Sequence, residues 1–356
     1  MDQRKFSLVL SGGGLKGLSH VGVFRALEEH GMAPSLVVGS SMGSLIAAAW
    51  AAGSSAAQMS KGAAKVRRKD VFRVAHADMA FRRMRAPGVY RREPLETLIH
   101  TIVGERTFDQ LPRRLVINTV DIDSGMQVLW GTPGLSDVKV ADAVFASCAL
   151  PGIFPPREIR GRFYCDGALV TNLPVRAALS LGQAPVVAVD VGATGDTWSD
   201  GERVGFASTY VRGLEIVMRT MLEGATRHWH GHPVLLVDPR VEHVSMFSFD
   251  ETPEIIEEGY RATMEALDGY GDRLFEDRPA IYPQRAVTVS IDSALCIGCG
   301  ACIMRAPAVF AYGPDGKAEV VAPHQVLSPF DGDYVPNCPT HAITARPDEA
   351  APPPRN

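Results

Sequence analysis

The 356-residue sequence has little net charge, few cysteines and no long apolar run. Its 36 basic and 40 acidic residues leave a formal net charge of −4, which argues against a nucleic-acid-binding protein. No stretch approaches the ~18 apolar residues of a membrane-spanning helix. Arg4 and Lys5 precede an apolar run at residues 6–10, but glycines end that run too early for an export signal. We therefore expect a cytoplasmic protein.

The six cysteines are unevenly distributed along the chain. Two stand apart from the others, and the remaining four gather in the C-terminal region: Cys148 and Cys165, then Cys296, Cys299, Cys302 and Cys338. Without an export signal, clustered cysteines indicate a metal site rather than disulfides. The two separate cysteines are expected to be small buried side chains.

The sequence has a serine in a sharp strand-to-helix turn. Residues 36–38 are an apolar run typical of a buried strand, and an alanine-rich helix is expected over residues 45–52. Between them GSSMG, at residues 39–43, matches the pattern G-x-S-x-G. A strand, a turn and a helix form the context in which this pattern exposes a nucleophile. The pattern therefore predicts that Ser41 is a nucleophile.

A glycine-rich turn, SGGGLKG at residues 11–17, lies between an expected strand at residues 6–10 and an expected helix at residues 18–30. Its G-x-G-x-x-G spacing also occurs in dinucleotide-binding units. Such units need an acidic residue at the end of the second strand, where this sequence has serines. Free N–H groups at a helix N-terminus suit an oxyanion instead. Neighbouring parallel strands end at the same edge of a sheet, so this loop is expected to face Ser41.

The rest of the first 276 residues alternates between strand and helix patterns, which predicts an α/β fold with a mostly parallel central sheet. Strands are expected over residues 115–122, 126–130, 185–191 and 234–238, and helices over residues 207–228 and from Thr252, with Thr252 as the cap and Pro253 as the first helical residue.

Residues 61–92 are strongly basic. They contain eleven Lys or Arg residues against Asp70 and Asp78, interleaved with large apolar side chains. One interpretation is a solvated helix face followed by a loop. The other is an interfacial segment that contacts anionic lipid, which would place the protein peripherally on a membrane.

Three motifs occur together in the order GGGLKG (residues 12–17), GSSMG (39–43) and DGA (166–168). With LP at 150–151, FPP at 154–156 and NLPV at 172–175, they resemble the patatin-like phospholipase family over about residues 5–274. The resemblance implies a three-layer α/β sandwich. It also implies a phospholipase or esterase that hydrolyses acyl esters with a Ser-Asp dyad.

By this resemblance Ser41 is the nucleophile, Asp166 is its base, and the glycine loop forms the oxyanion hole. The oxyanion donors implied are Gly12, Gly13 and Gly14, joined by Met42, and the other motif residues are Lys16, Gly17, Gly39, Gly43 and Gly167. A serine needs a neighbour to take its proton, and burial beside Phe163 and Tyr164 would raise the pKa of Asp166 toward usefulness. The alternative is a Ser-Asp-His triad, with His228, His230, His232 and His243 available. The H-x-H-x-H run at residues 228–232 could also bind metal, but it is interpreted as an exposed helix end.

The clustered cysteines form C-x-x-C-x-x-C followed by a distant Cys-Pro, which resembles the bacterial-type ferredoxins. In the two-cluster pattern a fourth Cys-Pro follows closely, and here that place is Ala306-Pro307. The resemblance implies one [4Fe–4S] cluster held by Cys296, Cys299, Cys302 and Cys338. Zinc is the alternative metal.

A change of composition near residues 277–279 suggests two domains. We expect a hydrolase domain at residues 1–279, a linker at 280–285, a ferredoxin-type α+β domain at 286–346 and a disordered tail at 347–356. The expected protein is a lipid acyl hydrolase whose cluster transfers electrons to a partner protein or senses redox state or iron. The alternative is an electron-transfer protein whose first domain mainly binds lipid.

Overall fold

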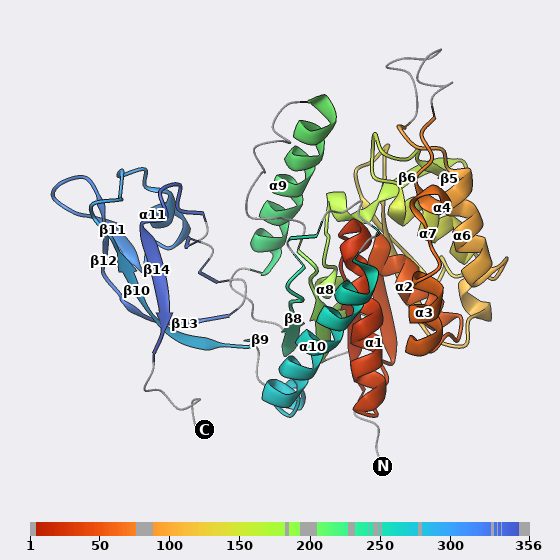
Figure 1. The fold of residues 1–356 in the computed structure, drawn as a ribbon, viewed down its shortest axis with the longest axis horizontal. Coiled ribbons are helices and arrows are strands. Elements are labelled where there is room, and N and C mark those ends of the chain that lie inside the picture. Colours follow the sequence, from red (N-terminus) through yellow and green to blue (C-terminus); the bar gives the residue numbers. More distant parts are fainter. Residues whose placement is uncertain are drawn as a thin grey trace. The chain divides into compact units, whose positions relative to one another are not determined.

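The structure, a computed structural model, describes residues 5–75, 88–181, 185–192, 205–226, 232–241, 243–244, 249, 251–276, 280–328, 331–332, 334–335 and 337–348 (Figure 1). The chain divides into two compact units, Met1–Ala225 with His232–Arg278, and Thr226–Gly231 with Pro279–Asn356.

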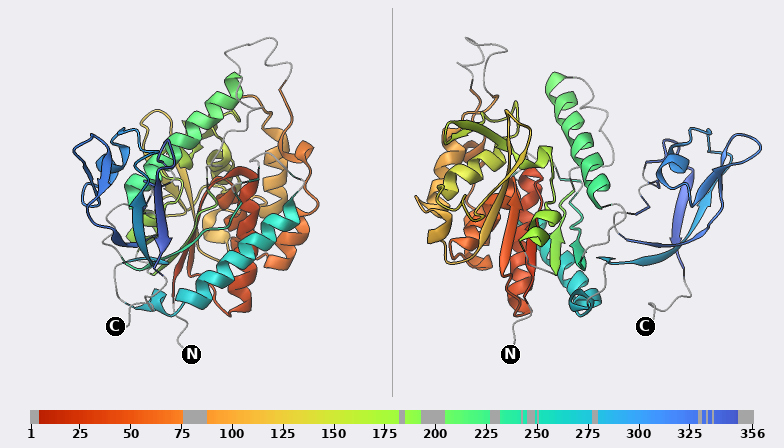
Figure 2. Two further views of the ribbon diagram at one scale, coloured as in Figure 1. Left: turned by 60° about the vertical axis from the view of Figure 1, so that its left-hand side comes forward. Right: turned by 180° about the vertical axis from the view of Figure 1, so that it is seen from behind.

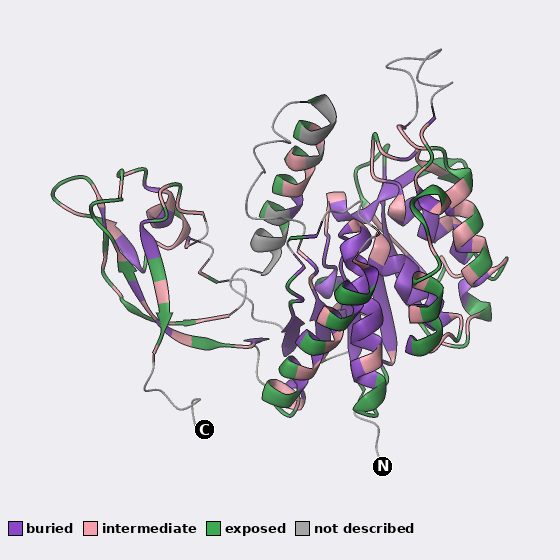
Figure 3. Cartoon of the chain, in the orientation of Figure 1, coloured by how far each residue is buried: buried purple, intermediate pink, exposed green. Residues whose placement is uncertain are grey.

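A mostly parallel sheet forms the centre of the first unit. Its parallel strands follow the order β3-β2-β1-β7-β8, and their bounds are β1 (Ser7–Leu10), β2 (Leu36–Ser40), β3 (Leu115–Asp121), β7 (Val186–Val189) and β8 (Val234–Val237). Every residue of these five strands is buried (Figure 3). Their runs of Val and Leu suit strands that are covered on both faces.

Antiparallel strands extend the sheet beyond β3. The strands β4 (Gln127–Trp130) and β6 (Arg162–Asp166) both pair with β3, and β5 (Arg157–Ile159) pairs with β6. The register places Asp166 opposite Thr119. This pairing places the end of β6 beside β3, which is the neighbour of β2 in the sheet.

Helices pack against the sheet and complete the expected α/β fold, which is confirmed. Their bounds are η1 (Gly14–Leu18), α1 (Ser19–Glu29), α2 (Met42–Ala51), α3 (Ala56–Ala63), α4 (Arg68–Val71), α6 (Glu93–Val103), η3 (Phe108–Gln110), α7 (Val140–Cys148), η4 (Gly167–Leu169), α8 (Val175–Ser180), α9 (Phe206–Thr226), α10 (Thr252–Tyr270) and η5 (Arg273–Phe275). Among them, α2 packs on β2, α7 on β3 and β6, and α8 on β1, β2 and β7.

The helices α1 and α10 lie side by side although more than 200 residues separate them in the sequence (Figures 1 and 2). Glycines make this approach possible. A Cβ atom on Gly22 of α1 would lie 1.9 Å from the carbonyl oxygen of Ile256, and one on Gly259 of α10 would lie 2.0 Å from that of Ser19. The two backbones are therefore in direct contact.

Two helix starts differ from the sequence-based expectation. The helix α2 begins at Met42, immediately after Ser41, rather than at Leu45. The cap of α10 is Glu251, and Thr252 is already helical, so the prediction of Thr252 as the cap was wrong. The Thr252 hydroxyl donates to the carbonyl of Phe249, 3.2 Å away, instead of serving the helix N-terminus.

The second unit is a small α+β domain. An antiparallel sheet has the order β13-β10-β14, β11 and β12 form a separate pair, and one short helix follows the cysteine loop. The bounds are β9 (Ile281–Tyr282), β10 (Arg285–Ile291), α11 (Ala301–Arg305), β11 (Phe310–Tyr312), β12 (Ala318–Val320), β13 (His324–Leu327) and β14 (Ile343–Pro347). Its core includes Val289, Phe310 and Tyr334, and the two rings of Phe310 and Tyr334 meet edge to face. Residues 281–282, in the expected linker, form β9.

Within the described ranges, no helix combines the length and the apolar composition needed to cross a bilayer.

Candidate active site

Ser41 occupies the sharp turn between β2 and α2. Its backbone has φ +51° and ψ −126°, a strained conformation for a residue with a side chain. Two hydroxyl groups hold the turn: Ser147 Oγ accepts from the Ser41 N–H at 2.8 Å, and Ser44 Oγ donates to the Ser41 carbonyl at 2.6 Å. Ser147 in turn donates to the carbonyl of Asn118 on β3, at 2.7 Å. The neighbouring strand thus fixes the turn.

The helix can start beside the strand because Gly43 has no side chain. A Cβ atom there would lie 2.5 Å from the carbonyl oxygen of Leu10 on β1. Close approaches of the same kind explain the other motif glycines, since a Cβ atom would lie within 3 Å of another atom at Gly12, Gly13, Gly17, Gly39 and Gly167.

Asp166 lies beside Ser41 at the end of β6 and is 2% exposed. Its carboxylate accepts hydrogen bonds from the N–H of Ala168, at 2.9 Å, and from the Ser41 hydroxyl. Burial raises the pKa of Asp166 from 3.8 to about 7, against the lowering effect of these hydrogen bonds. A carboxylate with this pKa is an effective proton acceptor at neutral pH.

The glycine loop is anchored by a side-chain amide. Asn172 accepts from the N–H of Gly12 at 2.9 Å and donates to the Gly12 carbonyl at 3.2 Å. The Gly12 N–H is therefore already used, which corrects its expected place among the oxyanion donors. In the part of the chain that the structure describes, the N–H groups of Gly13, Gly14 and Met42 have no acceptor. Three of the four expected donors thus remain available.

The buried side chain of Lys16 also holds the glycine loop in place. Lys16 is 2% exposed, and its ammonium group donates to the carbonyl of Gly192 at 3.5 Å and lies near the carboxylate of Asp190. Burial raises the pKa of Asp190, and the charge of Lys16 opposes that rise. Lys16, which the motif singled out, therefore ties the loop to the end of β7.

Ser41 and Asp166 line one pocket of about 70 Å³. Ser41, Asp166, Asn172 and the glycine loop form its polar side. The remaining wall is apolar and includes Leu150, Ile153, Phe154 and Met218. Such a pocket can hold a carbonyl group against Ser41 and an apolar group opposite it.

Within the described residues, no histidine lines this pocket. His228 and His230 lie outside the described residues, and His232 and His243 are exposed. The buried His20 donates through Nε2 to the Ser11 carbonyl, 2.9 Å away, and burial lowers the pKa of His20 to about 4. The described geometry therefore gives Ser41 a carboxylate partner and no imidazole.

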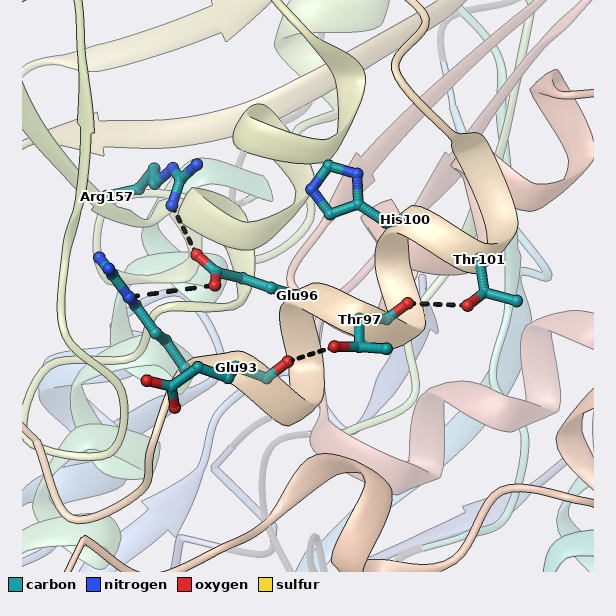
Figure 4. Close-up of a pocket in the computed structure, with 7 residues that line it drawn as sticks. Glu93, Glu96, Thr97, His100, Thr101 and Arg157 are labelled. Atoms are coloured by element: carbon teal, nitrogen blue, oxygen red, sulfur yellow. Dashed lines mark hydrogen bonds and ion pairs between the residues drawn. The ribbon is translucent and has the colours of Figure 1, made fainter.

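A second hollow, on the outer side of α6, is shown in Figure 4. Several of its polar groups are already held in ion pairs or hydrogen bonds. Arg157 pairs with Glu96 at 2.5 Å and with Asp142, and the hydroxyls of Thr97 and Thr101 donate to helix carbonyls. This hollow is an ion-paired surface depression that contains none of the residues expected in the active site.

The basic segment at residues 61–92 is only partly described. Arg82, Arg83 and Arg85 lie outside the described residues, as do all residues from 76 to 87. The other basic residues of the segment are exposed: Lys61, Lys65, Arg67, Arg68, Lys69, Arg73, Arg91 and Arg92.

The four clustered cysteines of the second unit line one small pocket: Cys296, Cys299, Cys302 and Cys338. Although burial acts to raise it, N–H donors from Thr340, Ala342 and Ile343 hold the pKa of the Cys338 thiol below its usual value. The Ala342 N–H lies 3.3 Å from the sulfur. Donors of this kind stabilise the thiolate that a metal requires.

The loop at residues 296–302, which carries three of the cysteines, is tightly turned at two glycines. Gly298 and Gly300 have φ values of +70° and +72°, and a Cβ atom on Gly300 would lie 2.1 Å from the Tyr312 hydroxyl. Among the described residues, no group of three or more His, Cys, Asp or Glu side chains is arranged to hold a metal ion.

Two family profiles match the sequence. Residues 8–179 match the patatin-like phospholipase family, and residues 291–345 match the 4Fe-4S single cluster domain of ferredoxin I. Both resemblances drawn from the motifs are confirmed. Cys148 lines the Ser41 pocket and Cys165 is buried, and both lie outside the second match.

Curated relatives are similar to part of the chain. An uncharacterized NTE family protein of Mycobacterium tuberculosis is 29% identical over 187 residues, 52% of this chain and 49% of that protein. Human patatin-like phospholipase domain-containing protein 6 is 33% identical over 196 residues, 54% of this chain and 14% of that protein. A cGAMP-activated phospholipase of Escherichia coli is 24% identical over 289 residues, 70% of this chain and 80% of that protein. The chain thus spans about half the length of the mycobacterial relative.

Proposed function

Because this chain joins a patatin-like phospholipase domain to a 4Fe-4S single-cluster domain, we propose that it is a lipid acyl hydrolase that carries an iron–sulfur centre. One observation carries the hydrolase proposal. The Ser41 hydroxyl is hydrogen-bonded to Asp166, whose pKa is about 7, in a pocket flanked by free N–H groups. Phospholipids, lysophospholipids and related acyl esters are the proposed substrates.

The proposed reaction uses Ser41 as nucleophile and Asp166 as base. As the Ser41 oxygen attacks the ester carbonyl, its proton passes to Asp166, and the carbonyl oxygen becomes an oxyanion. Collapse of this intermediate releases the alcohol, which takes the proton from Asp166, and leaves the acyl group on Ser41. Asp166 then deprotonates a water molecule that releases the fatty acid.

The N–H groups of Gly13, Gly14 and Met42 are the proposed oxyanion donors. They stand at the N-termini of η1 and α2, where the helix dipole adds a partial positive charge. Removing one such donor typically costs about 3 kcal/mol of transition-state stabilisation. Asn172 positions the loop rather than contacting the oxyanion, since its amide is bonded to Gly12.

Hydrolysis of a chromogenic acyl ester by the purified protein tests the dyad. Ser41→Ala and Asp166→Asn should each lower kcat/KM by several orders of magnitude, because each removes a group that acts in the transition state. The control variants His232→Ala and His243→Ala change exposed histidines and should retain activity. Full loss in either histidine variant would indicate a triad, and unchanged activity in Ser41→Ala would show that Ser41 is not the nucleophile. An inactive wild-type chain would favour a lipid-binding rather than a catalytic domain.

For the second unit we propose one [4Fe–4S] cluster held by Cys296, Cys299, Cys302 and Cys338. When bound, such a cluster supplies reversible one-electron transfer. The four cysteines would hold the cluster as thiolates, and the N–H groups around Cys338 stabilise the charge of that one thiolate. Electron exchange with a partner protein, or sensing of redox state or iron, is the proposed purpose.

The exposed basic residues of segment 61–92 support a proposed peripheral contact with anionic lipid. Lysine and arginine side chains near an anionic membrane surface are each worth about 1 kcal/mol of binding. Such a contact would bring the Ser41 pocket, which shares Val71 and Phe72 with this segment, to its lipid substrate.

A further inference from the structure

Asn118 lies on β3, between the strand that leads to Ser41 and the strand that ends at Asp166. The register places Asn118 opposite Ser40 on β2, and the next residue, Thr119, lies opposite Asp166 on β6. The side chain of Asn118 is 0% exposed and does not line the Ser41 pocket. Asn118 also belongs to none of the motifs that predicted the site.

The side-chain amide of Asn118 has a hydrogen-bond partner at both ends. Its Nδ2 group donates to the Thr171 carbonyl at 2.8 Å and to the Ser40 hydroxyl at 3.3 Å. Its Oδ1 atom accepts from the amide of Gln127 on β4 at 2.8 Å. Because a carbonyl oxygen can only accept, the bond to Thr171 determines which end of the amide is Nδ2. An apolar side chain of the same shape could make none of these three bonds.

Asn118 supports the nucleophile by two routes. Its side chain is bonded to Ser40, the residue that precedes Ser41. Its backbone carbonyl accepts from the Ser147 hydroxyl at 2.7 Å, and that hydroxyl accepts from the Ser41 N–H at 2.8 Å. The position of Ser41 relative to β3 therefore depends on both the side chain and the backbone of Asn118.

The same amide also lies against the turn that follows the base. A Cβ atom on Gly167, the residue after Asp166, would lie 2.5 Å from Asn118 Nδ2, so the Gly167 backbone packs directly on the amide. Thr171, whose carbonyl accepts from Nδ2, precedes Asn172, the residue that anchors the glycine loop. One buried side chain thus contacts the neighbours of the nucleophile, of the base and of the loop anchor.

We propose that Asn118 is a positioning residue that sets the distance between Ser41 and Asp166. The proposal rests on the proposed hydrolase function and adds the residue that aligns its two reacting groups. Its argument is that the amide contacts Ser40 beside the nucleophile and Gly167 beside the base, from the strand that separates them. A displacement of about 1 Å at a catalytic group can lower the rate by about 100-fold.

Asn118→Leu tests the proposal, because leucine has nearly the same shape and removes the three bonds of the amide. Thr119→Val is the matched control. Thr119 is the next residue of β3 and is equally buried, and its hydroxyl donates to the Val128 carbonyl at 3.1 Å and accepts from Trp130 Nε1 at 2.8 Å. The control therefore removes two buried bonds from the same strand, but both lead to β4 rather than to the catalytic motifs.

The first measurement is hydrolysis of a soluble acyl ester by the full chain. Asn118→Leu should lower kcat by about 100-fold and leave KM nearly unchanged, because Asn118 does not line the pocket. Thr119→Val should keep the wild-type kcat. Urea denaturation of both variants shows whether each is folded in the assay. A folded Asn118→Leu with the same kcat as Thr119→Val would overturn the proposal.

The rate at which a fluorophosphonate labels Ser41 tests the same point without an ester. Labelling should slow by a similar factor in Asn118→Leu and stay unchanged in Thr119→Val. If Asn118→Leu does not fold, Gln127→Leu decides the question, since it removes only the bond at Oδ1 of Asn118. Labelling should then slow to a smaller extent, and an unchanged rate would reject the proposal. A wild-type chain that the probe does not label would overturn the hydrolase function, and this proposal with it.

Discussion

At the scale of single residues, the burial of Asp166 makes its carboxylate a stronger base but costs folding free energy once the carboxylate is ionised. Its carboxylate must be ionised to accept the proton of Ser41, yet burial favours the protonated form and raises the pKa to about 7. We predict that kcat/KM for a soluble ester rises as the pH increases through about 7 and then levels off. A rate that is constant from pH 5 to pH 9 would contradict this role of Asp166.

The same shift predicts a pH-dependent cost to folding. Because the folded pKa lies above the usual 3.8, the folded state binds more protons, and the contribution of Asp166 to stability falls as the pH rises from 3.8 to about 7. This difference corresponds to on the order of 4 kcal/mol. Asp166→Asn should therefore be more stable than the wild-type chain in urea at pH 8, and this gain should shrink at pH 5.

Sequence motifs predicted the residues that carry out the chemistry but not those that position them. Ser41 and Asp166 sit in short patterns that require particular residues at fixed spacing. Ser147 and Asp190 sit in no such pattern, because their contacts join residues more than 100 positions apart. Asn172 belongs to a motif, but its bond to Gly12 is likewise visible only in the fold.

At the scale of helices and strands, the contact between α1 and α10 requires glycine at positions 22 and 259. Gly22→Ala should destabilise the protein by roughly 3 kcal/mol, because its Cβ atom would meet backbone atoms of α10 that cannot move aside. Gly269→Ala is the matched control. Gly269 also lies in α10, but a Cβ atom on it meets nothing within 4 Å, so this change should stabilise by about 0.5–1 kcal/mol.

Urea denaturation of the two variants measures both effects. Equal stabilities would show that the helices can separate without cost. The sequence predicted the helix at residues 18–30 from its apolar periodicity, the helix from Thr252 from its start signals, and the buried strands from their Val-rich runs. It could not predict which helices are neighbours, because strand order and helix pairing depend on contacts between distant segments. The early start of α2 also escaped prediction, since the backbone turn at Ser41 that permits it is held by Ser147 on α7.

At the scale of the whole molecule, the α1–α10 contact extends the hydrolase unit well beyond the family match at residues 8–179. We predict that a chain ending at Pro279 folds and hydrolyses esters without iron, whereas a chain ending at Glu251 lacks α10 and is insoluble. The full chain, prepared without oxygen, should contain about four irons, and Cys338→Ala should make the cluster labile.

Iron analysis and ester assays of these chains decide the outcome. An inactive chain ending at Pro279 would make the second unit part of the hydrolase structure. Zinc in place of iron would reject the cluster. The boundary near residue 279 was predicted from composition alone, and the truncated chains test it.

The same pairing has a consequence for synthesis on the ribosome. Domains commonly fold as units while the chain is being made, N-terminal parts first. Here α1 cannot complete its packing until α10 has left the ribosome, because Gly22 lies against the backbone of α10 and Gly259 lies against the backbone of α1. The ribosome is by then translating the cysteine-rich unit. Nascent chains of this protein therefore remain without a finished first unit until their clustered cysteines are already being made.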